Sequence, residues 1–466
     1  MMTPVSPVSL YILIPTNSHR EVDYSQHVHI ERSVFLSGLW GYGVVIGNAS
    51  GAEDPSGTPK PDGLQSPAPQ GCSVQGCLFD GVGQGGVLLF GFDASPAPGN
   101  NGSRAAGNNT QPRNSTVSFN VMQSIGGQLI HVAGVSLRSA SNSTVAHNRV
   151  RGTPRYGREA DSFNISPIQN SRFHTLEFNI LSDTNRLTTD TGAIEMLGSG
   201  KPGSVANGTA PWYMANLVRH NNISATQGSS SSDGKHVCVH GVPDEGCRRL
   251  VWGVYLDGGA SGATIYGNII GATLRGAIFD NAGGNNTHEN NIFVGEADGS
   301  SRVLMDFGSN ETVLAPRAVS GSLLKRNIFY FHNASIANKS VWPAMLASQI
   351  PWSNNELKDQ GSDFNVFWTP SAAARSPESS WPIFPEGQTL EQWQGTSGKR
   401  RFLRCGDSTF TVVTSTSANA PRWSYNETDR RFYAINYAGT TDKQQSGKSV
   451  LWQVINAVLL LSCHQH

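Results

Sequence analysis

Two aspartates occupy the positions in this sequence that are best suited to catalytic chemistry. Asp190 opens the stretch "DTGAIEMLG", and Asp257 closes the stretch "GVYLDG". Each carboxylate stands at one end of an alternating apolar run with a glycine within two residues, as a strand-end residue would. A pair of carboxylates suits glycosidic bond cleavage, in which one protonates the leaving oxygen and the other attacks or activates water. The alternative is that both are turn residues without chemistry, because Asp is common in turns.

Other side chains near these two aspartates are candidates for the same site. Asp280 in "GAIFDNAGG" is a third acid candidate, and Glu195 in "GAIEM" is a fourth. The candidates for substrate binding are Arg155, Tyr156, Arg158, Trp212, Tyr213 and Tyr255. The basic residues among them are explained equally well by a solvated loop. No metal-ligand spacing, phosphate-binding loop or nucleophile elbow is evident, so we predict neither a metal nor a cofactor.

A short repeat indicates which elements would position these residues. An apolar residue, an Asn and an apolar pair recur at spacings that start at about 23 residues, within the range of solenoid repeats. The recurring residues are Asn120, Asn148, Asn179, Asn222, Asn268, Asn291, Asn327 and Asn365. "VQGCLF" fits the same frame, with Gly76 and Cys77 in place of the Asn. Because Asn tolerates left-handed backbone and stacked Asn side chains can hydrogen-bond, we place each Asn at a bend between strands.

A second strand, often led by Gly, follows each Asn, as in "GAIEMLG" and "WGVYLDG". Two strand families per period make a coil that is too small to bury its own apolar face, and stacking makes that face continuous. The sequence therefore predicts an all-β fold, a right-handed parallel β-helix with a small C-terminal β appendage. A β-sandwich of many short strands is the alternative, but it does not explain an Asn at one frame position.

In a β-helix the two aspartates would meet on one face. Alternation directs Val254 and Leu256 inward, and Tyr255 and Asp257 outward. Without the Gly- and Ser-rich insertions, about one coil separates Asp190 from Asp257, and neighbouring rungs lie about 4.8 Å apart. We expect the two carboxylates to face one groove.

The histidines receive structural interpretations. His131 lies in the apolar stretch "LIHVAG" and is expected to be structural. His174, His220 and His288 lie in the Asn frame, and we expect them to be partly exposed turn residues.

Composition shifts divide the chain into four parts. Residues 1–24 form a poorly determined N-terminal segment, and residues 25–370 form the β-helix. Residues 371–395 form a Pro- and Ser-rich connecting segment. Residues 396–466 contain a few strand-like stretches and are predicted to form the β-rich appendage.

The charge balance narrows the class of partner. The chain has 34 basic and 34 acidic residues. Nucleic acid or an anionic membrane would require a basic excess, so neither is expected. No apolar run reaches the roughly 18 residues of a membrane span. We expect a monomer whose partner is a polysaccharide or glycan.

Cysteines and glycosylation acceptors favour the secretory pathway. The six Cys form an even set, in which Cys238 and Cys247 could close one local disulfide and Cys72 and Cys77 another. Thirteen Asn-x-Ser/Thr triplets occur, although an Asn- and Ser-rich chain also produces them by chance. We expect an extracellular or secretory protein whose signal peptide is missing from this chain.

The longest of these motifs carry a family resemblance. "VWGVYLDGGASGATIYGNIIGATLRGAIFDNAGGNNTHENNIFV" resembles the hallmark block of pectate-lyase-like parallel β-helix proteins. "RGTPRYG", "TTDTGAIEMLGSG", "SDFNVFW" and "TLEQWQ" are similar to motifs of the same group, and the sequence resembles glycoside hydrolase family 141 and similar uncharacterised β-helix proteins. The resemblance covers about residues 25–395 and departs from the family after "TLEQWQ". It implies that Asp190 and Asp257 are the catalytic pair and that the substrate is a cell-wall-type polysaccharide.

Three functional hypotheses follow. The first is a glycoside hydrolase that uses the two aspartates. The second is a non-catalytic carbohydrate-binding or surface-structural β-helix. The third is a polysaccharide lyase or epimerase, which would need a Lys, Arg, His or Tyr base beside the groove.

Overall fold

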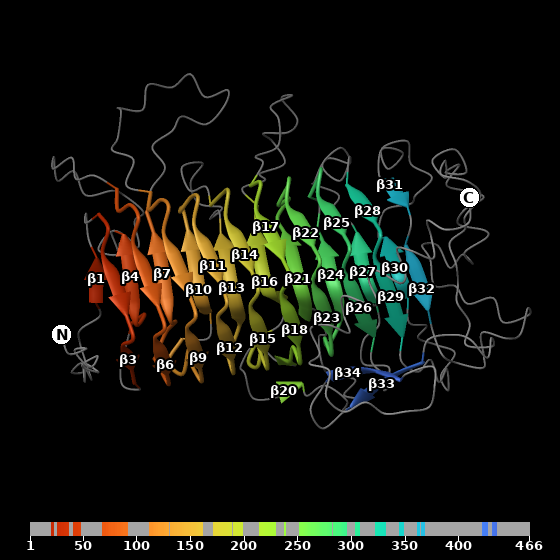
Figure 1. Ribbon diagram of the computed structural model, residues 1–466, viewed down its shortest axis with the longest axis horizontal. Helices are drawn as coiled ribbons and strands as arrows, with labels where there is room; N and C mark the ends of the chain where they lie inside the picture. The colour runs from red at the N-terminus through yellow and green to blue at the C-terminus, as the bar shows by residue number, and fades with distance from the viewer. Residues whose placement is uncertain are drawn as a thin grey trace, which may run out of the picture.

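The computed structural model is all-β throughout the part of the chain that it describes (Figure 1). The described residues are 20–22, 26–36, 41–47, 68–91, 111–129, 131–161, 171–188, 190–198, 214–229, 237–238, 251–281, 283–295, 303–307, 322–331, 344–348, 361–363, 365–368, 422–426 and 431–435. Within these ranges there is no helix, and thus none that could cross a membrane.

Three parallel sheets of ten strands each run along one axis. Sheet 1 contains β1 (Arg20–Val22), β4 (Val44–Gly47), β7 (Val87–Phe90), β10 (Ala133–Arg138), β13 (Tyr156–Asp161), β16 (Thr191–Leu197), β21 (Val251–Asp257), β24 (Gly276–Asp280), β27 (Val303–Phe307) and β30 (Ala344–Ser348). Sheet 2 contains β2 (His29–Glu31), β5 (Ser73–Gln75), β8 (Thr116–Ser118), β11 (Thr144–Ala146), β14 (Thr175–Glu177), β17 (Leu217–Arg219), β22 (Thr264–Tyr266), β25 (Thr287–Glu289), β28 (Leu323–Lys325) and β31 (Gly361–Asp363). Sheet 3 contains β3 (Val34–Phe35), β6 (Leu78–Asp80), β9 (Val121–Gln123), β12 (Arg149–Arg151), β15 (Ile180–Ser182), β18 (Asn222–Ser224), β23 (Ile269–Gly271), β26 (Ile292–Gly295), β29 (Ile328–Phe331) and β32 (Val366–Trp368).

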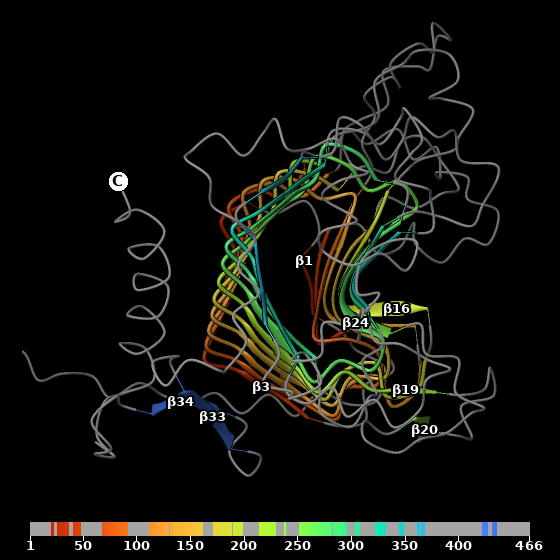
Figure 2. The same ribbon diagram turned by 90° about the vertical axis from the view of Figure 1, so that its right-hand side faces the viewer.

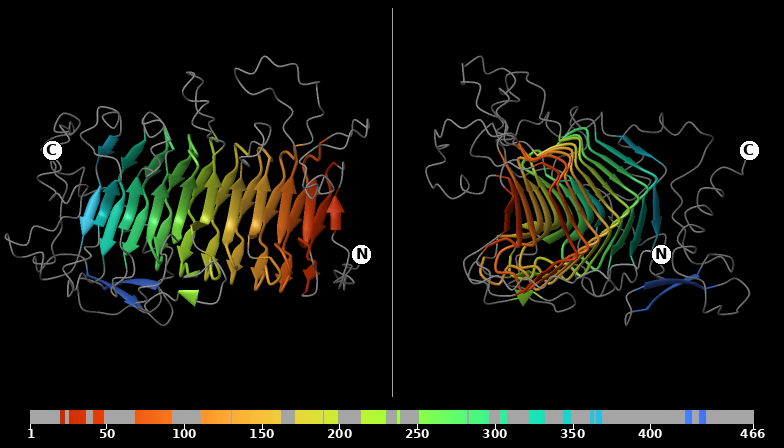
Figure 3. Two further views of the ribbon diagram at one scale, coloured as in Figure 1. Left: turned by 180° about the vertical axis from the view of Figure 1, so that it is seen from behind. Right: turned by 60° about the vertical axis from the view of Figure 1, so that its left-hand side comes forward.

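The chain visits sheets 1, 2 and 3 in turn, so three strands complete one coil (Figure 2). Every pairing within these sheets joins successive coils in parallel, and the stack is continuous from β1 to β32 (Figure 3). The predicted all-β, parallel β-helix fold is therefore confirmed. Two short antiparallel pairs accompany it, β19 (Gly228–Ser229) with β20 (Val237–Cys238), and β33 (Arg422–Asn426) with β34 (Arg431–Ile435).

The prediction of two strand families per coil was wrong, because the Asn motif itself contains two strands. In one coil, β8 ends at Ser118 and β9 begins at Val121, with the bend between them. The left-handed backbone falls on the residue before the Asn and not on the Asn, as Phe119 with φ 57° shows. The same conformation recurs at His147, at 57°, and at Phe178, at 52°.

The Asn side chains form a hydrogen-bonded ladder inside the bend between sheets 2 and 3. In each rung, the backbone N–H and the side-chain amide of one Asn both donate to the Oδ1 of the next coil's Asn. From Asn120 to Asn148 these distances are 3.0 and 2.9 Å. The ladder members are Asn120, Asn148, Asn179, Asn221, Asn268, Asn291, Asn327 and Asn365.

Two positions refine the predicted repeat. The sequence pattern assigned one rung to Asn222, but Asn221 carries the ladder and Asn222 is exposed as the first residue of β18. Cys77 takes the Asn place as predicted, and its backbone N–H donates to Asn120 Oδ1 at 2.9 Å. An unmatched backbone amide in a dry interior would be unfavourable, so the ladder both closes each bend and sets the coil register.

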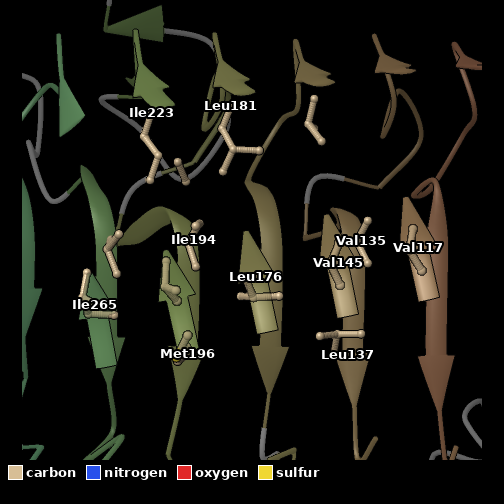
Figure 4. Close-up of a cluster of buried hydrophobic side chains, with 14 of the residues drawn as sticks. Val117, Val135, Leu137, Val145, Leu176, Leu181, Ile194, Met196, Ile223 and Ile265 are labelled. Atoms are coloured by element: carbon tan, nitrogen blue, oxygen red, sulfur yellow. The ribbon is translucent and has the colours of Figure 1, made fainter. Parts of the chain in front are cut away.

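The core lies inside the coils, in columns of apolar residues that match from strand to strand. In sheet 2, Val117, Val145, Leu176 and Ile265 belong to one such column, which also includes Val218 (Figure 4). Each of these side chains is buried. Burying one Val, Leu or Ile stabilises the fold by about 1.5–3 kcal/mol, so the stacked coils together provide a core that no single coil could.

Candidate functional site

The candidate site lies on the outer face of sheet 1, where β16, β21 and β24 are neighbours. Glu195 pairs in register with Tyr255, and Leu197 pairs with Asp257. The alternating residues Val254 and Leu256 are in the core, so Tyr255 and Asp257 face outward as predicted.

Asp190 stands directly before β16, with its side chain exposed and its backbone left-handed at φ 57°. Its Oδ1 atom accepts a hydrogen bond of 3.1 Å from the Tyr255 hydroxyl. Buried Asn185 fixes this turn, because its side-chain amide donates hydrogen bonds to Thr191 Oγ1 and to the Gly192 carbonyl, both at 3.0 Å. A rigid turn thus presents an exposed carboxylate toward the next coil.

Asp257 ends β21 and is only partly exposed. Its Oδ1 atom accepts hydrogen bonds of 2.7 Å from the Gly258 backbone N–H and from Asn281 Nδ2. Burial raises the pKa of the Asp257 carboxyl, while the Asn281 and Gly258 hydrogen bonds oppose that shift and the charge of Asp190 adds to it. Asp257 therefore holds a proton to higher pH than an ordinary Asp does.

Tyr255 lies between the two carboxyl groups. Asn281 Nδ2 is 3.4 Å from the Tyr255 hydroxyl oxygen and 2.7 Å from Asp257 Oδ1, so Asn281 links Tyr255 to Asp257. The ring is buried and stacks on Phe279 with 5.2 Å between centroids. Burial, and then the charges of Asp257, Asp190 and Glu195, raise the pKa of this hydroxyl well above its usual range.

These contacts limit how far apart the carboxyl groups can be. Asp190 Oδ1 is 3.1 Å from the Tyr255 oxygen, which is 3.4 Å from Asn281 Nδ2, which is 2.7 Å from Asp257 Oδ1. Laid end to end, the three steps place the two Oδ1 atoms at most about 9 Å apart, and this upper limit does not exceed the separations of glycosidase carboxyl pairs. The two aspartates predicted from the sequence are therefore close together on one face.

Arg155 lies beside Asp190 and contacts the next residue, Tyr156. Arg155 Nη2 donates to the Asp190 carbonyl at 3.1 Å, and Nη1 is 2.9 Å from His131 Nδ1. The Arg155 guanidinium also covers the ring of Tyr156, 4.6 Å from its centroid. Arg158 lies one strand away in β13, in register with Ile194, and its side chain is outside the described part.

The two additional acid candidates have different surroundings. Glu195 faces outward next to Tyr255 but is buried, and its Oε2 atom accepts a hydrogen bond of 3.1 Å from the Gly192 N–H. Asp280, expected to face the groove, instead points into the coil. It pairs in register with core residue Leu256 and is fully buried.

Asp280 has interior partners that explain its burial. Its carboxyl accepts hydrogen bonds of 3.0 and 3.1 Å from Asn286 Nδ2 and lies 3.3 Å from His288 Nε2. A buried carboxylate is retained only where such partners compensate for lost water. Asp280 is thus a buried polar group whose side chain points into the coil, away from the outer face that carries Asp190 and Asp257.

The prediction that three histidines are partly exposed turn residues is confirmed for one of them and wrong for the other two. His220 is exposed, but His174 and His288 are buried. His174 accepts a hydrogen bond of 3.2 Å from the Ser143 N–H, and burial lowers its pKa to about 4. His131, expected to be structural in an apolar strand, is exposed before β10 and contacts Arg155.

The remaining predicted residues are two aromatic side chains and four cysteines. Trp212 and Tyr213 lie outside the described residues, as does Cys247, the proposed partner of Cys238. Cys72 and Cys77 are not joined to each other. They flank β5, and both are buried thiols whose pKa burial raises. Among the residues with described positions, no group of three or more His, Cys, Asp or Glu side chains could hold a metal.

Sequence reasoning missed Asn281, Asn185 and Phe279. Asn281 bridges Tyr255 and Asp257, and it is the residue opposite Asp257 on the next coil because Asp280 is opposite Leu256. The signal was the Asn that follows the strand in "FDNAGG", but only the strand register reveals which coil position it occupies.

No family model matches the sequence, and no curated protein matches it. Among solved structures, the chain is similar to a mutant tailspike protein of E. coli bacteriophage HK620 in complex with a pentasaccharide. The identity is 12%, the TM-score is 0.36, and the match covers 73% of this chain and 49% of that chain. A mutant DFA-IIIase from Arthrobacter chlorophenolicus A6 in complex with DFA-III is 10% identical, with a TM-score of 0.30 and coverage of 85% and 78%. The Dettilon tailspike protein is 11% identical, with a TM-score of 0.31 and coverage of 81% and 56%. No function of this chain follows from likenesses at this level.

Proposed function

We propose that this protein is a glycoside hydrolase in which Asp257 is the proton donor and Asp190 is the base or nucleophile. The observation that carries the proposal is a close pair of carboxyl groups in unlike surroundings on one outer face. Asp190 is exposed, whereas Asp257 is partly buried with a raised pKa. A carboxyl group with a raised pKa is suited to donate a proton, and a second carboxyl group that is exposed beside it is suited to act as base or nucleophile.

The chemistry follows from that asymmetry. A protonated Asp257 gives its proton to the glycosidic oxygen as the bond breaks, which avoids expulsion of an alkoxide. The ionised Asp190 carboxylate either activates a water molecule or attacks the sugar carbon directly. The upper limit of the carboxyl separation accommodates both modes, and therefore both inverting and retaining outcomes are candidates.

The sequence resemblance to glycoside hydrolase family 141 supports the same pair of residues. It also suggests cell-wall-type polysaccharides as the first substrates to assay. Arg155, fixed against the Asp190 backbone, is placed to contact a sugar hydroxyl or carboxylate at the same edge.

The lyase or epimerase hypothesis needs a strong base at this place. Tyr255 is the phenol nearest the carboxyl pair, but its raised pKa makes it a weak source of tyrosinate at neutral pH. Tyr255 is therefore a poor base for elimination, and the paired carboxyl groups make hydrolysis the first reaction to assay.

The test is release of reducing sugar from a polysaccharide panel by the wild type, Asp190→Asn and Asp257→Asn. Loss of a general acid or base reduces the rate by about 10²- to 10⁴-fold. Asp80→Asn is the matched control, because Asp80 accepts a hydrogen bond from Gln123 on sheet 3 at 3.0 Å, away from the site. Equal rates in all four proteins would remove the pair from the mechanism, and glycan binding without turnover would favour the carbohydrate-binding hypothesis.

A further inference from the structure

The Tyr255 hydroxyl is the link between the two carboxyl groups. It carries one proton and two acceptor lone pairs. The proton is directed to Asp190 Oδ1 at 3.1 Å, and the oxygen faces Asn281 Nδ2 at 3.4 Å. Asp257 Oδ1 accepts a hydrogen bond from the same Asn281 amide at 2.7 Å, and therefore lies at most about 6 Å from the Tyr255 oxygen, within reach directly or through one water molecule.

We propose that Tyr255 is a proton relay that returns a proton from Asp190 to Asp257 after each turnover. This inference rests on the proposed hydrolase function, in its inverting mode. At the end of the reaction Asp257 has lost its proton to the leaving oxygen, and Asp190 has gained one from the attacking water. The site must then exchange these protonation states before the next substrate can react.

The relay step conserves every proton and the net charge. The O–H bond of the Asp190 carboxyl breaks as its proton passes to the Tyr255 oxygen. The original Tyr255 O–H bond breaks at the same time, and a new O–H bond forms on Asp257, either with that proton or through one bridging water molecule that takes up one proton and gives up another. Asp190 ends as a carboxylate, Asp257 ends as a carboxylic acid, and Tyr255 remains a phenol.

The surroundings of Tyr255 favour a concerted transfer. Burial and three nearby carboxylates raise the pKa of the phenol, so a free tyrosinate intermediate would be unfavourable. The ring is held by Phe279, which also stacks on Trp252 with 4.9 Å between centroids. A fixed ring keeps the hydroxyl in place between the two carboxyl groups, and proton transfer depends on such fixed positioning.

Tyr255→Phe is the direct test, because it removes the hydroxyl and keeps the stacked ring. Tyr266→Phe is the matched control on sheet 2. The ring centroids of Tyr266 and His220 lie 5.4 Å apart in an edge-on arrangement. The first readout is the titration of carbon-13-labelled aspartate carboxyl groups by NMR, without substrate.

In the wild type, Asp190→Asn should move the Asp257 titration midpoint by about one pH unit or more, as coupled groups do. In the Tyr255→Phe background that shift should fall to half or less, while Tyr266→Phe should leave it unchanged. The relay is overturned if Asp190→Asn leaves the Asp257 titration unmoved in the presence of Tyr255. It is also overturned if Tyr255→Phe preserves the full coupling.

A kinetic readout separates this inference from the proposed function. With a hydrolysed substrate, Tyr255→Phe should lower kcat about 10-fold or more with little change in KM, and should alter the pH profile. A Tyr255→Phe protein with wild-type kcat and pH profile refutes the relay and leaves the hydrolase intact. Absence of hydrolysis by the wild type on every glycan refutes the hydrolase, while the titrations still report on the coupling.

Discussion

Replacing one rung of the Asn ladder should reveal how strongly the ladder holds the coils. In Asn221→Ala, five side-chain hydrogen bonds disappear. They join Asn221 to Asn179, Leu176, Arg219 and Asn268, at distances of 2.8 to 3.0 Å. The backbone N–H of Asn179 would lose the acceptor that it has at 3.0 Å and remain buried.

The size of the effect follows from the buried groups left without partners. Each unsatisfied buried donor or acceptor costs about 1–3 kcal/mol. With the Asn179 N–H abandoned and the Leu176 carbonyl deprived of its 2.8 Å partner, we expect Asn221→Ala to lower the free energy of unfolding by about 3–4 kcal/mol. Asn222→Ala is the matched control. Its exposed side chain stands outside the ladder, so the effect should stay within about 0.5 kcal/mol.

Hydrogen exchange and urea unfolding together provide the assay. A solenoid can open coil by coil, so exchange of individual amides reports the local effect better than one global midpoint. The Asn179 amide should lose more than about 100-fold of its protection in Asn221→Ala and keep it in Asn222→Ala, since 1.4 kcal/mol corresponds to tenfold. Similar protection in both variants would refute the reasoning that the ladder anchors the bends.

Three further outcomes are expected. The pKa of Asp257 is raised by burial, so glycan hydrolysis should fall as pH rises through that pKa, and a rate that climbs across the same range would contradict the proton-donor role. His174 has a pKa of about 4 when folded and about 6.5 when unfolded, so the unfolded chain binds more protons as pH falls. Urea unfolding at pH 5 should therefore show about 2 kcal/mol less stability than at pH 7. The His174→Gln variant should not show this loss. Gly267→Ala should reduce thermal stability by about 1–3 kcal/mol, because φ is +64° and a Cβ would lie 2.7 Å from His220 Nδ1, whereas Gly127→Ala, with nothing within 4 Å, should be neutral in the same melting experiment.

The β-helix could be predicted because one hydrogen-bonding requirement repeats from coil to coil. From the bend between β8 and β9 to the bend between β31 and β32, an interior Asn amide at the same frame position meets it. The pattern could not distinguish Asn221 from Asn222, since adjacent Asn residues both fit the frame while only one faces inward. Nor could it assign the left-handed backbone, which falls on varied residues such as Phe119 and Arg326.

The orientation of the Asp280 side chain could not be predicted from the similarity of two sequence motifs. "GVYLD" and "GAIFD" look equivalent, so Asp280 seemed to follow Asp257 by one coil. In the structure Gly276 pairs with Trp252 and not with Gly253, and this shift of one residue turns Asp280 inward. Side chains alternate across a strand, so a single step in register exchanges the two faces. Asp257 and Tyr255 could be oriented from alternation within one strand, whereas Asp280 required the pairing between strands.

Several glycosylation triplets also have a structural origin. In three coils an Asn takes the left-handed turn before sheet 2, with φ from 53° to 54°, and a Thr two residues later begins the strand. The pairs are Asn114 with Thr116, Asn142 with Thr144, and Asn285 with Thr287. Asn tolerates that backbone and Thr favours strands, so coil geometry alone generates these triplets. An extracellular location for this protein is therefore a proposal that needs its own test, such as a mass shift after glycosidase treatment of the protein from eukaryotic cells.

The Asn ladder has a consequence for how such a molecule can change over time. Its rungs join residues that are 23 apart in one coil and 47 apart in another, yet the hydrogen bonds have the same geometry. The ladder hydrogen bonds form wherever a coil closes, and they do not depend on the number of residues in that coil. Segments outside the coils can therefore be lengthened, shortened or exchanged without moving Asp190 relative to Asp257. Grafting a foreign glycan-contacting segment between β16 and β17 would be a practical route to altered specificity on an unaltered frame.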